Sequence, residues 1–140
     1  MINIITEGVE FPDIEEDRLN KWINSVVEQK DKCIKDLSLV FCSDEYILDV
    51  NQNYLQHDYY TDIITFDYCS GCKISGDLII SLDTVLSNSQ KFNTSYNTEL
   101  HRVIIHGVLH LLGYKDKTPE EAKEMRQNED LALKQFETIA

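Results

Sequence analysis

Three residues in the C-terminal half of the chain, His106, His110 and Asp116, have the types and the spacing of a metal site. Histidines four positions apart lie on one face of a helix, one turn from each other, so both rings can bind a single ion as neutral nitrogen donors. Gly113 can end that helix, and the loop after it can bring the Asp116 carboxylate back to the same ion. Two nitrogens and one carboxylate oxygen, with a fourth position left for water, are typical of a catalytic zinc site.

This ligand set predicts a particular chemistry. An ion held with one open position lowers the pKa of bound water and supplies hydroxide near neutral pH. A structural zinc site normally closes all four positions, usually with thiolates, and no cysteine lies in this stretch. The zinc-protease motif has a glutamate directly after its first histidine as the general base, whereas this chain has Gly107 there. The pattern therefore predicts one divalent ion, zinc or another metal that accepts these ligands, and leaves the general base unidentified.

An alternative interpretation makes His106 and His110 core residues whose ring nitrogens are satisfied by hydrogen bonds. Two histidines at this spacing also occur without a metal, so the pair alone does not decide the question. The helix break at Gly113 and the carboxylate six residues after His110 favour the metal site. A third histidine, His101, is five positions before His106, points elsewhere on the helix and is assigned no role.

The helix that carries the two histidines is expected over about 97–112, and its apolar residues spread around the whole circumference. Such a helix is normally buried at the centre of a fold. Gly113 ends it, and the next helix starts with a capping box of Thr118 and Glu121, with Pro119 in its first turn. The metal ligands are therefore expected on a central buried helix and on the loop that leaves it.

The rest of the chain alternates strand patterns with amphipathic helix patterns. Asp13 with Glu16 forms a second expected capping box, and Ser70-Gly71 is an expected hairpin turn. Strands are expected at 2–6, 37–42, 63–66 and 78–80, and helices from about 13, after Ser43, at about 82–92 and from Thr118. This order predicts an α+β fold in one domain over residues 1–140, with a small mixed four-stranded sheet covered by about five helices.

The composition limits the class of protein. A chain of 140 residues suits one domain, and 42% hydrophobic residues can support a folded core. The start of the chain lacks a basic region followed by an apolar run, and no apolar stretch can span a bilayer. We therefore expect a cytoplasmic protein without membrane contact and with its cysteines reduced. The formal net charge of −12 argues against non-specific binding to nucleic acid, although a local basic cleft is compatible with it.

Several other residues have chemistry of their own. Glu99, on the histidine face of the central helix, is a candidate acid or base. Asp62 and Asp77 stand at expected strand starts, where each is either an acceptor for a metal-bound histidine or a turn residue. Cys69 and Cys72 form a CxxC without a thioredoxin context or a second CxxC. Reduced turn cysteines are therefore favoured over a redox pair or half of a zinc site.

Four segments resemble motifs of the YbeY family, and they occur in the family's order over nearly the whole chain. The most specific is HGVLHLLGY at 106–114, which is similar to the family pattern HGxLHLxGYDH. The supporting segments are TDIITF at 61–66, similar to TDVLSF, GDLIIS at 76–81, similar to a GDI strand, and Val50-Asn51 with Tyr54, similar to LNxxYR.

The resemblance implies a bacterial metal-dependent endoribonuclease that acts on single-stranded RNA. It implies a role in ribosomal RNA processing, chiefly at the 3′ end of the small-subunit rRNA, and in ribosome quality control, with the small subunit or its proteins as partners. The family has three histidine ligands; His106 and His110 match two of them, and Asp116 stands at the third position. The predicted set is therefore His106, His110 and Asp116 around one Zn²⁺.

The chain departs from the family pattern at Leu55, where the family has an arginine that can hold a scissile phosphate. His57 is either a partial substitute or an exposed loop histidine. Lys115 and Lys117 flank Asp116 in the loop after the central helix, where they either face a phosphate or are solvated. Two alternative functions stay open: a metal-dependent hydrolase of peptides or small substrates, and a non-catalytic ribosome-biogenesis factor with a structural metal.

Overall fold

The computed structural model of the chain describes residues 1–55 and 62–139, except for the side chains of residues 54 and 55. The element order is the predicted one, with a short π-helical segment, η1, added after the second helix. The elements are β1 (Ile2–Glu7), α1 (Glu16–Glu28), β2 (Cys33–Cys42), α2 (Asp44–Val50), η1 (Asn51–Leu55), β3 (Ile63–Asp67), β4 (Lys73–Ser81), α3 (Leu82–Lys91), α4 (Tyr96–Leu111) and α5 (Pro119–Thr138).

The strands form one mixed four-stranded sheet in the order β1-β2-β4-β3, which confirms the predicted fold class. β1, β2 and β4 are parallel, and the edge strand β3 runs antiparallel to β4. The β3–β4 turn lies at Ser70-Gly71, as predicted, with Gly71 at a φ of 60°. β2 and β4 both begin earlier than predicted, because their first residues, from Cys33 and Lys73, pair with each other although the segments are polar and partly exposed.

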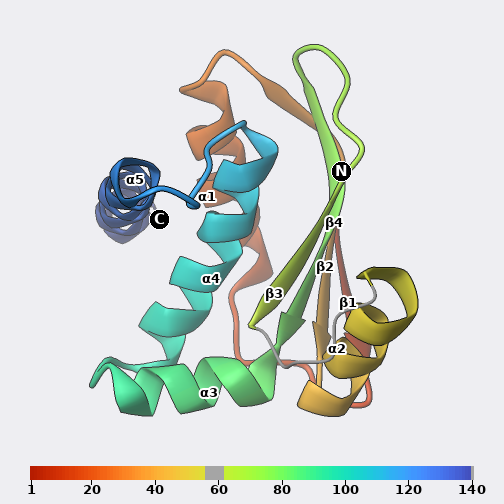
Figure 1. Ribbon diagram of the computed structural model, residues 1–140. Coiled ribbons are helices and arrows are strands. Elements are labelled where there is room, and N and C mark those ends of the chain that lie inside the picture. The colour runs from red at the N-terminus through yellow and green to blue at the C-terminus, as the bar shows by residue number, and fades with distance from the viewer. Residues whose placement is uncertain (56–61, 140) are drawn as a thin grey trace.

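The main core lies between one face of the sheet and the helices α1, α4 and α5, and α2 covers the other face (Figure 1). α4 is buried along most of its length, as its apolar circumference predicted. Gly107 lets this helix come close to the sheet: a Cβ at that position would lie 2.7 Å from Ile63 Cδ1 and 2.9 Å from Leu78 Cδ2. The central helix thus packs closely against β3 and β4.

One of the two predicted capping boxes is present. Thr118 and Glu121 cap α5 in both directions, by the bonds expected of a capping box. The box predicted for Asp13 and Glu16 is wrong, because α1 begins at Glu16 itself and no side chain caps it. A backbone bond of 2.9 Å from Ile14 N to Pro12 O keeps this segment in a tight turn, so the helix starts three residues after Asp13.

Candidate metal centre

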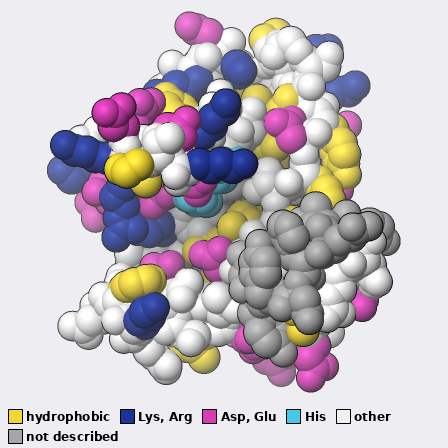
Figure 2. Space-filling view, viewed as in Figure 1, with side chains coloured by type: hydrophobic (Ala, Val, Ile, Leu, Met, Phe, Trp, Pro, Cys, Tyr) yellow, Lys and Arg dark blue, Asp and Glu magenta, His cyan; other side chains and the backbone are white. Residues whose placement is uncertain are grey.

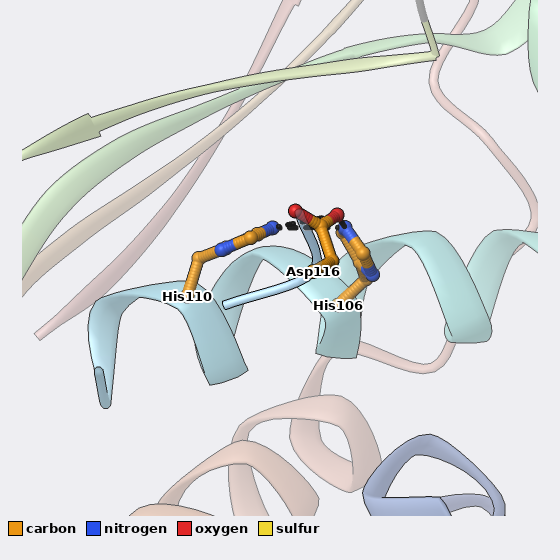
Figure 3. Close-up of side chains that lie close together, drawn as sticks. All are labelled: His106, His110 and Asp116. Carbon is orange, nitrogen blue, oxygen red and sulfur yellow. Dashed lines mark hydrogen bonds and ion pairs between the residues drawn. The ribbon is translucent and has the colours of Figure 1, made fainter. Parts of the chain in front are cut away.

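His106 and His110 on α4 and Asp116 on the loop after it point toward one another (Figure 3). The two histidine Nε2 atoms are 3.0 Å apart, and each is 3.3 Å from Asp116 Oδ2. Within the described part of the chain, these residues form the one group of three or more His, Cys, Asp or Glu side chains close enough to share an ion. The structure therefore brings together the three residues that the sequence singled out.

The loop reaches the histidines because the chain reverses sharply at the end of α4. Gly113 has a φ of 104°, a left-handed conformation that favours glycine, and Tyr114 N donates to Leu109 O at 3.0 Å. Tyr114 O in turn lies 3.0 Å from His110 Nδ1. The reversal thus places Asp116 over the last two turns of α4 and also orients one of the histidine rings.

Glu129 on α5, which the sequence interpretation missed, orients the other ring. Its Oε2 lies 2.6 Å from His106 Nδ1, and its Oε1 accepts from Arg102 Nη1 at 3.0 Å. The residue is only 5% exposed, in line with Met125 and Ala132 on the inner face of α5. A carboxylate on the apolar face of a helix needs a buried partner, and this was the signal available in the sequence.

The hydrogen bonds decide which ring nitrogens carry protons. A carbonyl or a carboxylate oxygen only accepts, so His110 Nδ1 donates to Tyr114 O and His106 Nδ1 donates to Glu129. In the neutral rings, both Nε2 atoms then hold lone pairs and face each other and the Asp116 carboxylate. Three acceptors at this separation repel one another, and a cation between them removes the repulsion. The tautomers are those that a metal-binding pair requires.

The spacing of the donor atoms fits a tetrahedral ion. With metal–ligand bonds of about 2.0–2.1 Å, the donors of a tetrahedral zinc site are roughly 3.3–3.4 Å apart. The separations of 3.0 and 3.3 Å lie at or just below that value. The described residues contribute two nitrogens and one oxygen to the set, one donor fewer than a tetrahedral ion takes. The spacing of the three side chains therefore fits a tetrahedral ion.

Further carboxyl groups near the candidate ligands influence the charge of the site. Burial lowers the pKa of His106, but the hydrogen bond and charge of Glu129, together with Asp116 and Asp62, raise it above its usual value overall. Burial raises the pKa of Asp62 and of Glu99, and each carboxyl also feels the charge of Glu129. Of these groups, Glu129, Asp116 and Asp62 act on His106, and negative charge there favours a bound cation.

The remaining candidates have different outcomes. Asp77 lies beside Tyr68. His101 Nδ1 contacts Asn97 O, and its ring packs against Trp22 and Phe136. His57 is outside the described residues, as is the side chain of Leu55.

The cysteines of the CxxC are free in the structure. Cys69 is half-buried and its thiol takes part in hydrogen bonds with Ser75, while Cys72 is exposed at the turn. Both therefore fit the expectation of reduced turn cysteines.

The residue after His106 also bears on function. Because Gly107 faces Ile63 and Leu78 of the sheet, a glutamate base of the zinc-protease kind has no room there.

The fold and the three donors define an α+β protein with a candidate catalytic metal centre. Residues 4–137 match the model of the family described as Endoribonuclease YbeY. The chain belongs to this family. The matched range includes all three candidate ligands.

Curated relatives named Endoribonuclease YbeY align over most of their length. The protein from Bacteroides fragilis is 56% identical over 91% of this chain and 92% of its own, and that from Parabacteroides distasonis is 58% identical over 91% and 89%. A solution structure of a Thermotoga maritima protein is similar in fold, with a TM-score of 0.71 at 25% identity over 97% of this chain and 89% of that one. No helix in the described part of the chain is long and apolar enough to cross a membrane.

Proposed function

We propose that the chain, as a single domain over residues 1–140, is a metal-dependent endoribonuclease that cleaves single-stranded RNA. Its substrate would be ribosomal RNA, chiefly the 3′ end of the small-subunit rRNA. Its partners would be the small subunit or its proteins in the cytoplasm, where it would also act in ribosome quality control. The observation that carries the proposal is the convergence of two histidine Nε2 lone pairs and one carboxylate in a member of this family.

The proposed ligands are His106, His110 and Asp116, and the proposed ion is one Zn²⁺. When bound, such an ion polarises a phosphate oxygen and makes hydroxide available near neutral pH. Glu129 and Tyr114 O hold the two rings with their Nε2 atoms turned toward the site. Asp116 gives the loaded site a formal charge of +1, where three histidines would leave +2, so hydroxide should form at a somewhat higher pH than in relatives with three histidines.

The ligand assignment is tested with Asp116→Ala, Asp116→His and His110→Ala. After incubation with zinc and removal of the unbound ion, we expect the two alanine variants to retain little zinc. They should also cleave an unstructured RNA at least about 100-fold more slowly than the wild type. Asp116→His should retain zinc and activity, because it replaces one donor with another. Zinc is measured by atomic absorption and cleavage on denaturing gels. Full zinc content in Asp116→Ala would show that Asp116 is not a ligand.

The reaction class is tested with wild-type protein on three substrates: single-stranded RNA, the same RNA annealed to its complement, and casein. Zinc-dependent cleavage of the single strand alone supports the proposal. Cleavage of casein would instead indicate a peptidase. If none is cleaved while His106→Ala unfolds the protein, the metal is structural.

A further inference from the structure

A second feature lies directly beside the loop that carries Asp116. A cavity of about 450 Å³ opens between the turn from α1 to β2, which contributes Lys30 and Lys32, and the loop from α4 to α5, which contributes Tyr114 and Lys115. Residues far apart in the sequence thus line one hollow, and its charged residues are these three lysines together with Glu121 and Glu124. In a chain with a net charge of −12, a lining with an excess of one positive charge is a local exception.

The cavity and the metal centre share a loop. Lys115 precedes the candidate ligand Asp116, and Tyr114 O lies 3.0 Å from His110 Nδ1. A molecule in this cavity therefore lies against the segment that positions two of the three ligands. A space-filling view of the molecule shows Lys and Arg side chains, together with Asp and Glu side chains, next to the visible histidine surface (Figure 2).

The lining combines the two chemistries that single-stranded nucleic acid needs. Lysines attract successive phosphates, and an aromatic ring stacks with a base whatever its sequence. The Tyr114 ring is half-buried and lines the cavity, with Lys30 Nζ 5.3 Å from its centroid. Lys30 is exposed on a flexible stem, so it can move aside for a base and still reach a phosphate.

Two glutamates also line the cavity, and they differ in their hydrogen bonding and exposure. Glu121 Oε1 accepts from Thr118 N at 3.0 Å and lies in the first turn of α5, where the helix dipole offsets its charge. Glu124 is exposed at the rim. Its carboxylate repels an approaching phosphate, so removing its charge should tighten the binding of an anionic ligand.

We propose that this cavity binds one nucleotide of single-stranded RNA next to the scissile position, with its base against Tyr114 and its phosphates among Lys30, Lys32 and Lys115. The inference rests on the proposed function, since it names where the RNA substrate of that site is held. In this acidic protein the contact would be local and would include a stacking contribution that salt does not screen.

The test measures binding without cleavage. Fluorescence anisotropy of a short labelled oligouridylate is recorded in EDTA over a range of salt concentrations. Tyr114→Ala should weaken binding roughly 5- to 150-fold, the range for loss of one base–aromatic stack, whereas Tyr114→Phe should bind like the wild type. The combined Lys30→Gln, Lys32→Gln, Lys115→Gln variant should reduce the slope of log Kd against log salt by about 2, at roughly 0.7 per phosphate contact.

Two controls address charge and folding. Lys21→Gln, Lys91→Gln and Lys134→Gln, combined, make the same change in net charge at lysines that do not line the cavity, and should leave the slope unchanged. Glu124→Gln should tighten binding about two- to fivefold, the usual range for one exposed charge. This gain cannot result from misfolding.

The outcomes separate the two proposals. Unchanged binding by Tyr114→Ala and an unchanged salt slope in the triple-lysine variant would overturn the cavity assignment, even if the wild type cleaves RNA. So would wild-type protein that does not bind the oligonucleotide. Conversely, if the variants lose binding as expected but zinc-loaded wild type cleaves no RNA, the cavity is an RNA site and the proposed nuclease function fails.

Discussion

At the scale of single residues, the candidate metal centre depends on groups outside the three candidate ligands. Glu129 fixes the tautomer and direction of His106, and a backbone oxygen does the same for His110. Glu129 is itself held by Arg102, which also donates to Asp130 at 2.8 Å. Partners of this kind raise the basicity of a metal-bound histidine and keep its ring in place.

Glu129→Gln should therefore weaken zinc binding about 10- to 100-fold, since the amide is neutral and orients the ring less strongly. The change is measured by competition with a chromophoric chelator. Asp130→Asn is the matched control: it removes the more exposed partner of Arg102 and should leave the zinc affinity within about twofold. Equal affinities for Glu129→Gln and the wild type would exclude a positioning role for Glu129.

Glu99 gives a prediction on pH. Burial raises its pKa above the usual 4.5, with Arg102 opposing and Asp62 adding to the shift. A raised pKa means that folding favours the protonated carboxyl, so ionisation destabilises the protein as the pH rises above 4.5. Glu99→Gln should therefore unfold at higher urea concentration than the wild type near pH 7 in EDTA, and the difference should shrink near pH 4. A difference independent of pH would contradict this origin.

At the scale of elements, the site depends on the close approach of α4 to the sheet. Gly107 and Gly76 both lie at this contact. A Cβ on Gly76 would collide with the backbone oxygen of Phe66 on β3 and would lie 3.0 Å from Leu111 Cδ2 on α4. The glycine thus allows β3, β4 and the end of the ligand helix to meet.

Gly76→Ala should lower the free energy of unfolding by about 1–3 kcal/mol, the usual cost of overpacking, because the collision involves backbone. Urea denaturation of the metal-free protein measures it. Ser75→Ala, one residue earlier on the same strand, removes a hydroxyl that bonds Asp36 O on an exposed part of the sheet and should cost less. A Gly76→Ala variant as stable as the wild type would show that β3 can shift freely.

At the scale of the whole molecule, the hydrophobic core is built without the three candidate ligands. The buried side chains of α1, α4 and the sheet pack around Trp22 and Phe41, both fully buried, and none of the three candidate ligands is in that cluster. The candidate ligands are instead partly exposed at its edge, with Asp116 on a surface loop. Zinc should therefore add stability to a chain that already folds.

Chelation should leave the protein folded but lower its Tm by about 10 °C relative to protein with zinc at 100 times its Kd, which corresponds to about 2.7 kcal/mol. Differential scanning calorimetry with EDTA and with added zinc measures the shift. Asp116→Ala should show the Tm of the chelated wild type and little response to zinc. Complete unfolding in EDTA would instead point to a structural metal.

The sequence by itself determined the features that depend on local periodicity and chemistry. The apolar circumference of α4, the break at Gly113 and the capping box at Thr118 all predicted elements that the structure contains. The spacing of His106 and His110 predicted that their rings share a helix face. These predictions succeed because helix turns, caps and reversals involve residues a few positions apart.

Only the tertiary structure decided what depends on distant residues. The sheet order β1-β2-β4-β3, the bond from His106 to Glu129 on another helix and the lysine-lined cavity each join segments widely separated in the sequence. No local pattern specifies such pairs, because the packing of the whole core selects them. Hence the sequence predicts two histidines and an aspartate as candidate metal ligands, but only the fold shows that their Nε2 and carboxylate atoms converge.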